Sequence, residues 1–356
     1  MKPTRLLMLT LLATASGCKT DESAAAPAPI AAPQLPPAPS PAQVEAEAAA
    51  KAESDKKAAR TAAVATALAE LETENATEAA RWTPALRKQA SDLAAKAHKD
   101  TASGLKAILA SPHRAPGHAA RDAYRHPTET LTFFGLKPTM TVVELGAGGG
   151  WYTELLAPLL ARRGKLVVAG PSPSGAADEM STVYGKRLAA MVAGAPELYG
   201  KVQVAALSPP DQLELVPAGT ADLVIAMREM HGLQGRGQFD AYVAAVHAAL
   251  RDGGTFGVVQ HRAPAGARVE DTASKGYLPE AWVIERVQAA GFKLAAKSEI
   301  NANPKDTKDY ERGVWTLPPN FAAGEVDKAK YAAIGESDRM TLRFTKVAGA
   351  ASSLPR

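Results

Sequence analysis

The feature that most constrains the fold is a glycine-rich stretch that lies directly between a strand pattern and a helix pattern. The stretch, residues 144–150, reads Glu-Leu-Gly-Ala-Gly-Gly-Gly; it ends the β-branched run 141–145 and precedes an apolar helical pattern over 151–162. Glycine lets a backbone approach a ligand where a Cβ would collide, and the start of a helix presents free N–H groups. This order of strand, turn and helix predicts a ligand-binding turn at the end of a sheet strand.

The same alternation of strand and helix patterns continues to the end of the chain. Alternation of this kind predicts an α/β fold with a seven-stranded, mostly parallel sheet and helices on both faces. The insertion 301–338 is too long for a hairpin, and its aromatic residues favour an ordered lid. The strands are expected at 141–145, 165–169, 201–205, 221–226, 255–260, 293–300 and 339–346, and the helices between them at 151–162, 177–192, 238–250 and 279–290.

The chain begins with the pattern of a bacterial lipoprotein signal. Lys2 and Arg5 precede a short apolar run, and the segment closes on Ala-Ser-Gly-Cys. This ending resembles the lipobox, in which the cysteine becomes the lipidated N-terminus of the mature protein. Cys18 is the only cysteine, so lipidation leaves no thiol for a disulfide or a metal. The sequence therefore predicts a protein anchored by lipid alone in the bacterial cell envelope, on the periplasmic or outer-membrane face.

Composition divides the chain into further segments. An Ala/Pro-rich stretch predicts an extended tether, and an Ala/Glu/Lys-rich stretch with few large apolar residues predicts an exposed helix, which extends the fold at its N-terminus. A new helix starts at Thr83-Pro84 and runs to about Ser111. The expected segments are the signal 1–18, the tether 19–42, the exposed helix 43–82, a helical lid 83–135, the sheet domain 136–347 and a disordered tail 348–356.

The charge balance argues against a nucleic-acid partner. Lys and Arg number 41 against 37 Asp and Glu, and the two signs are mixed along the chain. The expected partner is a small-molecule substrate, with a membrane contact only through the lipid. The sequence gives no oligomeric state.

The glycine stretch resembles a known family. Its pattern Glu-x-Gly-x-Gly-x-Gly resembles the first motif of class I S-adenosylmethionine-dependent methyltransferases, whereas nicotinamide sites have Gly-x-Gly-x-x-Gly. Segments 221–231 and 250–256 are similar to that family's fourth strand and to the turn before its fifth. Segments 124–127 (Tyr-Arg-His-Pro) and 150–154 (Gly-Trp-Tyr-Thr-Glu) are similar to stretches of predicted bacterial methyltransferases that carry signal peptides.

The resemblance covers about residues 121–346 and implies a Rossmann-like fold, S-adenosylmethionine as the cofactor and methyl transfer to a small or medium acceptor. It also implies that the cofactor lies on the glycine turn and on the start of the next helix. The implied cofactor-binding residues are Glu144, Gly146, Ala147, Gly148, Gly150, Trp151 and Tyr152.

Candidate catalytic residues follow the fourth and fifth expected strands, because ligands in open α/β sheets bind at the carboxyl ends of the strands. Glu229 and His231 follow the fourth strand, and His261 with Arg262 follows the fifth. A histidine there can take a proton from the methyl acceptor, and a carboxylate can orient it. A histidine that only caps a strand end is the alternative.

Asp122 and His126 in the expected lid are further candidates for proton transfer. With His231 and Glu229 they complete the predicted catalytic set. The arginines of the same segment, Arg114, Arg121 and Arg125, could bind a carboxylate or pair with Asp122 to fix the lid. A metal shared by Asp122, His126, His231 and His261 is less expected, since no His-x-x-x-His or similar spacing occurs. No metal is therefore predicted.

Two features favour other functions. The second expected strand is not followed directly by the acidic residue with which the family holds ribose hydroxyls; Asp178 and Glu179 come late. S-adenosylmethionine is made in the cytoplasm, whereas the signal exports the chain. A non-catalytic ligand-binding lipoprotein with a degenerate Rossmann-like cleft is therefore the main alternative. A structural lipoprotein whose exposed helix docks partners is the third.

Overall fold

The computed structural model describes residues 40–350 and residue 354, so Cys18, the signal and most of the expected tether lie outside the described residues. The chain divides into two units, residues 1–53 and 54–356. In the first unit, every side chain over residues 41–53 is exposed. Among the described residues, no helix is both long and apolar enough to cross a membrane.

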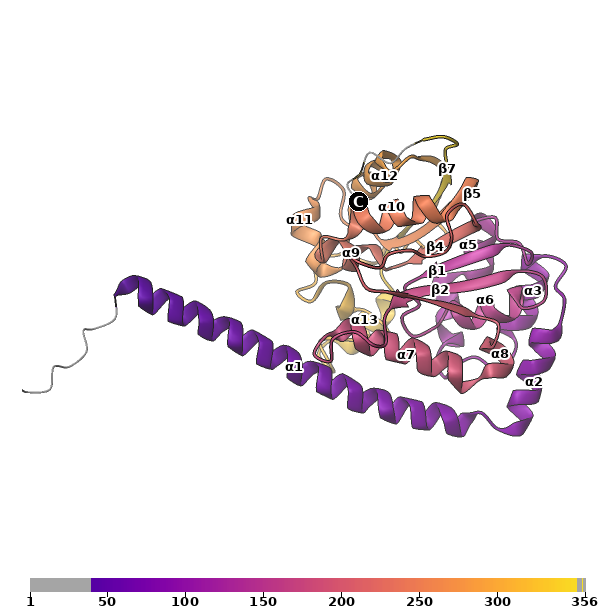
Figure 1. Cartoon of the computed structure of the whole chain (residues 1–356), viewed down its shortest axis with the longest axis horizontal. Helices are drawn as coiled ribbons and strands as arrows, with labels where there is room; N and C mark the ends of the chain where they lie inside the picture. The colour runs from indigo at the N-terminus through magenta and orange to yellow at the C-terminus, as the bar shows by residue number, and fades with distance from the viewer. Residues whose placement is uncertain (1–39, 351–353, 355–356) are drawn as a thin grey trace, which may run out of the picture. The chain divides into compact units, whose positions relative to one another are not determined.

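The second unit is built on a seven-stranded sheet (Figure 1). The order in the sheet is β3-β2-β1-β4-β5-β7-β6. Strands β1 to β5 pair in parallel, and β7 is antiparallel to both β5 and β6. This is the Rossmann-like fold that the sequence predicts, and its strand order reverses between β1 and β4. The strands are β1 (Thr141–Leu145), β2 (Lys165–Pro171), β3 (Gln203–Leu207), β4 (Ala221–Met227), β5 (Leu250–His261), β6 (Phe292–Ser298) and β7 (Arg339–Lys346).

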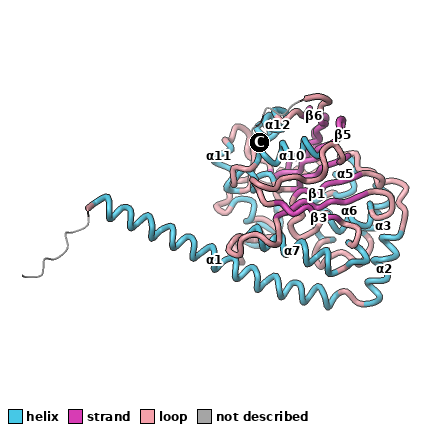
Figure 2. Tube along the Cα trace, viewed as in Figure 1, coloured by secondary structure: helices cyan, strands magenta, loops and turns pink. Residues whose placement is uncertain are grey.

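Helices cover both faces of the sheet, as Figure 2 shows by colour. They are α1 (Pro41–Arg81), α2 (Pro84–Ala95), α3 (Thr101–Leu109), α4 (Asp122–Arg125), α5 (Pro127–Phe133), α6 (Thr153–Leu160), α7 (Met180–Gly194), α8 (Pro196–Tyr199), α9 (Met230–Gly235), α10 (Phe239–Ala249), α11 (Val269–Thr272), α12 (Glu280–Ala289) and α13 (Lys328–Ile334), with 3-10 turns η1 (Ala119–Arg121), η2 (Ala273–Lys275) and η3 (Gly313–Thr316).

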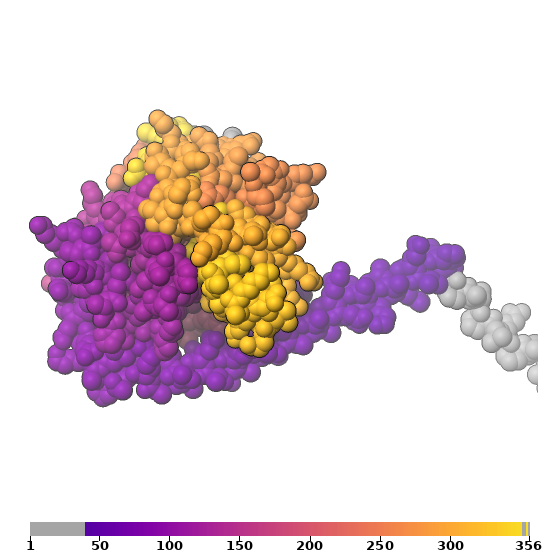
Figure 3. Space-filling model, turned by 180° about the vertical axis from the view of Figure 1, so that it is seen from behind, coloured from indigo at the N-terminus to yellow at the C-terminus, as the bar shows by residue number. Residues whose placement is uncertain are grey.

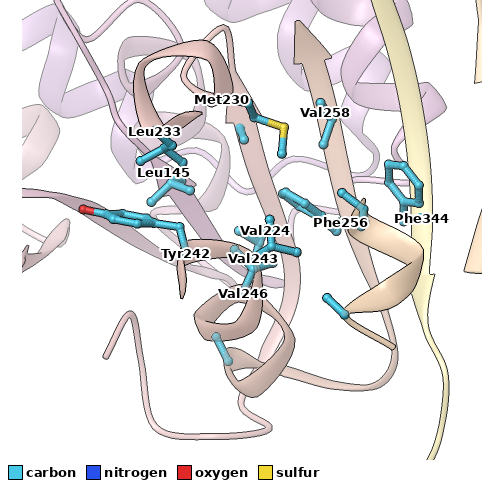
Figure 4. Packing of buried hydrophobic residues seen from close by; sticks show 14 of the residues in the cluster. Leu145, Val224, Met230, Leu233, Tyr242, Val243, Val246, Phe256, Val258 and Phe344 are labelled. Carbon is cyan, nitrogen blue, oxygen red and sulfur yellow. The ribbon is translucent and has the colours of Figure 1, made fainter. Parts of the chain in front are cut away.

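The two faces of the sheet bury separate apolar clusters. On one face, α9, α10 and α12 pack on β4, β5 and β7; Figure 4 shows Met230 of α9 and Val243 of α10 beside Val224 and Phe256. On the other face, α2, α3, α5 and α6 pack on β1, β2 and β4. Because both faces are covered, the strands are apolar at successive positions, which is the pattern from which the sequence predicts them.

Several local predictions are confirmed by the structure. Strands β1 and β7 have the predicted bounds. Thr83 caps α2, since its hydroxyl accepts a hydrogen bond from the Leu86 amide at 3.2 Å and Pro84 follows it. The single helix expected from Thr83 to Ser111 is instead two helices. The second begins because the Asp100 carboxylate accepts a hydrogen bond from the Ser103 amide at 2.8 Å.

The helix expected to be exposed over 43–82 buries one face of its second half. Val64 and Leu71 are 2% and 5% exposed and pack against Val183 of α7. Glu74 pairs with Arg187, also of α7, at 2.8 Å. The expectation is wrong for this half because its few large apolar side chains recur at helical spacing and so share one face.

The lid expected over 83–135 is mostly part of the core. Leu93, Leu105, Ile108 and Leu131 are buried in the cluster that covers β1, β2 and β4. Residue 136 therefore does not separate two independently packed parts of the chain. Residues 54–135 belong to the same compact unit as the sheet.

The insertion between β6 and β7 and the end of the chain also pack on the sheet unit. The insertion contains η3 and α13, and Figure 3 shows its yellow part beside the earlier purple part of the chain. Arg121 joins the two through an ion pair with Glu336 at 2.6 Å. Of the tail expected to be disordered, residues 351–353 and 355–356 lie outside the described residues, whereas Leu354 is 8% exposed and joins the core.

Candidate functional site

The candidate residues gather at the edge of the sheet where the parallel strands end. The glycine turn follows β1, and Glu229 follows β4. His261 ends β5 and is paired with Arg339 at the beginning of the antiparallel β7. The neighbours β1 and β4 are also the strands between which the order reverses. Open α/β sheets bind ligands at such a point.

The glycine turn has the backbone that its sequence predicts. Gly146, Gly148 and Gly150 have φ values of +70°, +56° and +77°, in the region that favours glycine. A Cβ at Gly146 would lie 2.9 Å from the Glu229 side chain, and one at Gly150 would meet the sulfur of Met191. A Cβ at Gly148 would have nothing within 4 Å. Open space for a ligand therefore adjoins Gly148.

Glu144, near the end of β1, connects the two sides of the glycine turn. Its side chain is buried, and its Oε2 accepts a hydrogen bond from the Thr153 hydroxyl at 2.7 Å. Burial raises the pKa of Glu144 to about 7, against the opposing effects of Thr153 and the charge of Arg228. The bond ties the end of β1 to the start of α6. Direct binding of the cofactor by Glu144 stays a prediction.

The rings of Trp151 and Tyr152 are buried directly after the turn. Trp151 donates a hydrogen bond from its indole nitrogen to the carbonyl of His118 at 3.0 Å. The guanidinium carbons of Arg114 and Arg125 lie 5.1 and 4.6 Å from the Trp151 ring centroid. These contacts position arginines of the site, and a direct contact of the two rings or of the half-buried Ala147 with a cofactor stays a prediction.

Glu154 fixes residues 113–122 on α6. Its buried carboxylate accepts hydrogen bonds from Arg114 Nε at 2.8 Å and from the Ala115 amide at 3.0 Å, and His118 Nδ1 lies 3.0 Å away. Burial raises the pKa of Glu154, but His118 and Arg114 outweigh it and hold the pKa below its usual range. Glu154 is therefore a charged anchor for this segment.

The two candidates from the expected lid have different surroundings. Asp122 accepts a hydrogen bond from Arg114 Nη1 at 2.5 Å and so belongs to the anchor of Glu154. His126 is half-buried between α4 and α5, with a φ of +41°. The pair with Arg114 gives Asp122 a structural role. Proton transfer by Asp122 or His126 stays a prediction.

Glu229 is the candidate that the structure places on the glycine turn. Its side chain lies against Gly146, and its Oε1 accepts a hydrogen bond from Arg236 Nη2 at 3.3 Å. Burial raises the pKa of Glu229, while Arg236 opposes the shift. The carboxylate therefore lies within reach of any ligand that the turn binds.

His231 lies in the first turn of α9 among aromatic rings. Its ring centroid is 5.5 Å from that of His261 and 5.8 Å from that of Trp315, and Nε2 of Gln260 is 3.4 Å from its Nδ1. Burial, with the charges of Arg228 and Arg236, lowers the pKa of His231 to about 4, although Gln260 opposes the shift. The ring is neutral at pH 7, so it can accept a proton, but only as a weak base.

The candidates after β5 are bound to the insertion. His261 Nδ1 forms a hydrogen bond with the Ser337 hydroxyl, and burial with the positive charges nearby holds its pKa well below the usual range. Arg262 forms ion pairs with Glu280, Glu299 and Asp338 at 3.1, 2.6 and 3.0 Å. Arg262 therefore fixes the insertion to β5.

The end of β2 has no carboxylate of its own. The strand ends at Pro171, and the two later acids, Asp178 and Glu179, lie 3.6 and 3.7 Å from Arg60 of α1. They thus have a partner away from the strand end. Across residues 40–350, no group of three or more His, Cys, Asp or Glu side chains is placed to hold a metal ion.

A cavity of about 510 Å³ adjoins the back of the glycine turn. Gly150, Glu154 and Met191 line it on one side, and Leu71 and Arg81 of α1 line it on the other. The second half of α1 therefore closes a space beside the turn.

The structure joins two arginines of the expected lid to two others that sequence reasoning did not single out, and the four form a cluster at this edge. Arg121 and Arg125 come from the segment before α5, Arg228 follows β4 and Arg339 begins β7. Glu336 lies among them and pairs with Arg121 at 2.6 Å and with Arg339 at 2.9 Å. The signal in the sequence was an arginine at the site end of each of two strands, but β5 lies between these strands in the sheet, so their approach depended on the strand order.

No protein-family model matches the chain, and no curated protein matches it in sequence. Solved structures with a similar arrangement include a SAM-dependent methyltransferase from Aquifex aeolicus, with 16% identity, a TM-score of 0.42 and coverage of 69% of this chain and 98% of that one. Another is the [4+2]-cyclase SpnF, with 17% identity, a TM-score of 0.44 and coverage of 70% and 94%. A third is a Burkholderia thailandensis 1,6-didemethyltoxoflavin-N1-methyltransferase with bound S-adenosylhomocysteine, with 15% identity, a TM-score of 0.38 and coverage of 71% and 93%. Similarity at this level concerns the fold alone.

Proposed function

We propose that the protein transfers a methyl group from S-adenosylmethionine to a small or medium-sized acceptor. The observation that carries the proposal is the glycine turn. It follows β1 at the reversal of strand order, all three alternating glycines have positive φ, and the space beside Gly148 is open. Such a turn is shaped for a ligand that touches the backbone, and the start of α6 presents N–H groups to an anionic part of that ligand.

The residues at the turn fit this cofactor at both of its charged ends. The N–H groups of the turn suit a carboxylate, and the Glu229 carboxylate beside Gly146 suits a positively charged sulfonium. When bound, the cofactor would supply an electrophilic methyl group, to which a nucleophile of the acceptor bonds in line as the methyl–sulfur bond breaks and S-adenosylhomocysteine leaves. The work of the chain is then to position the acceptor. The neutral ring of His231 is available to accept the proton that the nucleophile releases.

The second candidate function is a non-catalytic cleft that holds another ligand. The observation that favours it is the end of β2, where no acid follows and where Asp178 and Glu179 pair with Arg60. A cleft without a partner for ribose hydroxyls has one fewer contact with any nucleoside.

Calorimetric titration with S-adenosylmethionine and S-adenosylhomocysteine tests the proposal. We expect both to bind the wild-type protein. If neither compound gives a heat of binding at millimolar concentration, the result would favour the second candidate function, the non-catalytic cleft.

We also propose that Cys18 anchors the protein in the cell envelope, because small residues precede this single cysteine at the end of a signal-like run. Replacement of Cys18 by Ala should abolish lipid labelling and partition into detergent, and should leave the melting temperature of the folded protein unchanged. Phase partition and circular dichroism measure the two effects. Membrane association that persists in Cys18→Ala would place the anchor elsewhere.

A further inference from the structure

The arginine cluster, defined as Arg121, Arg125, Arg228 and Arg339, has more positive charge than its partners neutralise. Glu336 pairs closely with Arg121 and Arg339, whereas its nearest distance to Arg125 is 3.5 Å, to Nε. Among the ion pairs of the described residues, Glu336 is the only carboxylate that pairs with a member of this cluster, and Arg228 acts on Glu336 and on Glu144 through its charge alone. A buried surplus of charge is costly unless something else neutralises it.

Two of the arginines also have N–H groups without a partner. Arg125 is 2% exposed, and among the described residues none accepts a hydrogen bond from its Nη1. The same holds for Nη1 of Arg228, which is half-buried. A buried guanidinium with free donors is the group that binds carboxylates and phosphates most specifically.

Arg228 is held in a strained backbone conformation. Its φ is +63°, in the left-handed region that a long side chain rarely adopts, and its amide donates to the Val259 carbonyl at 2.7 Å. Such strain is tolerated mainly at functional sites. The position directly after β4 directs this residue to the site edge of the sheet.

The electrostatics support the same conclusion. Burial and then the charge of Arg228 lower the pKa of Arg125 to about 8, although Glu336 opposes the shift. A guanidinium does not give up its proton in proteins. The lowered pKa of Arg125 therefore reflects its burial and the positive charge of Arg228, both of which a bound anion would offset.

We propose that Arg125 and Arg228 bind an anionic group, a carboxylate or a phosphate, of the methyl acceptor. This inference rests on the proposed function and adds to it the chemical class of the substrate. The acceptor is then a small acid whose anionic end pairs with the two arginines and whose nucleophile points toward the glycine turn.

The positions of the arginines favour the acceptor over the cofactor as the source of the anion. Arg228 follows β4 and Arg339 begins β7, and both strands lie on the opposite side of β1 from β2. The cofactor's own carboxylate already has donors at the start of α6. The cluster also adjoins the turn, because the guanidinium carbons of Arg125 and Arg228 lie 4.6 and 5.9 Å from the ring centroids of Trp151 and Tyr152, so the choice between acceptor and cofactor needs the separate test below.

The test compares Arg228→Asn with wild type in thermal unfolding, with inorganic phosphate or malonate added at constant ionic strength against sodium chloride. Asparagine tolerates positive φ. We expect wild type to gain roughly 3–5 °C with at least one of the two anions. Arg228→Asn should melt at least as high as wild type without the anion, because both strain and surplus charge are removed, and should gain less than a third as much with it.

Arg343→Gln is the matched control. Like Arg125, Arg343 places its guanidinium over an aromatic ring, with its guanidinium carbon 5.3 Å from the Phe133 ring centroid. Unlike Arg125, it donates a hydrogen bond to a carbonyl, that of Phe133 at 3.0 Å, and it lies outside the cluster. Its anion response should equal that of wild type. No anion response in wild type, or an equal one in Arg228→Asn, would overturn the proposal.

A second experiment, which compares the binding of two nucleosides, distinguishes the acceptor from the cofactor as the source of the anion. S-adenosylhomocysteine carries a carboxylate, and 5′-methylthioadenosine lacks it. We expect Arg228→Asn to bind each as wild type does. Selective loss of S-adenosylhomocysteine affinity in this variant would assign the arginines to the cofactor and overturn the acceptor proposal. If neither nucleoside binds wild type, the proposed function fails, and the anion response still reports on the arginines by itself.

Discussion

A protein that begins at Ser54 should melt at the temperature of the mature chain, whereas one that begins at Thr83 should melt roughly 10 °C lower. The residues removed in the second case include Val64, Leu71 and Trp82, each 5% exposed or less. Burial of such side chains stabilises a fold by about 1.5–3 kcal/mol each, which gives an upper estimate of several kcal/mol. Circular dichroism at 222 nm measures the difference.

Two valines of the same helix provide the matched point variants. Val64 is 2% exposed, whereas Val44 is 51% exposed and lies in the first unit. Val64→Ala should cost about 1–3 kcal/mol and Val44→Ala close to nothing. Equal melting of the chains that begin at Ser54 and at Thr83 would show that α1 contributes no stability to the sheet unit.

Two buried glutamates beside the glycine turn should respond to pH in opposite ways. Both are 2% exposed, but burial raises the pKa of Glu144 to about 7, whereas His118 and Arg114 hold the pKa of Glu154 below its usual range against the effect of burial. Glutamine is the same size as glutamate and removes the titration of each.

Replacement of Glu154 by Gln should destabilise the protein by about 1.5–3 kcal/mol at pH 7, because it removes a charged partner of the buried Arg114 and leaves Asp122 as its carboxylate partner. The stabilising effect of this carboxylate is present above the pKa of the unfolded chain and is lost as the pH falls through the lower folded pKa. The difference between wild type and Glu154→Gln should therefore shrink only in acid. Urea unfolding at pH 3.5 and pH 7 measures it.

The pH dependence of stability expected from Glu144 has the opposite sign to that expected from Glu154. Its folded pKa of about 7 exceeds the ordinary glutamate value of 4.5. The folded protein thus holds a proton that the unfolded chain releases between these pH values, and wild type loses stability as the pH rises through this window. Relative to wild type, Glu144→Gln should gain about 3 kcal/mol between pH 4.5 and pH 8.5. A pH-independent difference between Glu144→Gln and wild type would show that Glu144 does not titrate there.

The central strands β1, β2 and β4 were predictable because each is an apolar run with valine or isoleucine. The glycine turn was predictable because glycine adopts the φ values of Gly146, Gly148 and Gly150 far more readily than any other residue. The face of the sheet on which the Glu144 side chain lies can also be derived from the sequence. Side chains alternate along a strand, so Glu144 shares a face with Val142, which packs under α6, and not with Val143.

The remainder depends on contacts between distant parts of the chain. The packing of Val64 and Leu71 required the surface of α7, more than a hundred residues later. The arginine cluster combines side chains from α4, from the end of β4 and from the start of β7, and no local pattern joins these segments. The left-handed φ of Arg228 could not be predicted either, because the residue at this position is not a glycine.

The central claim is that the glycine turn binds the cofactor, and calorimetric titration of two aspartate variants with S-adenosylhomocysteine tests it most directly. Gly148 and Gly219 have φ values of +56° and +72°, and a side chain at either meets nothing within 4 Å, but Gly219 precedes β4 at the opposite edge of the sheet. The strain of an aspartate is therefore similar at both. We predict that Gly219→Asp binds as wild type does, and that Gly148→Asp binds at least about a hundredfold more weakly because its charge adjoins the ligand's carboxylate. Equal affinity of the two variants would contradict the claim.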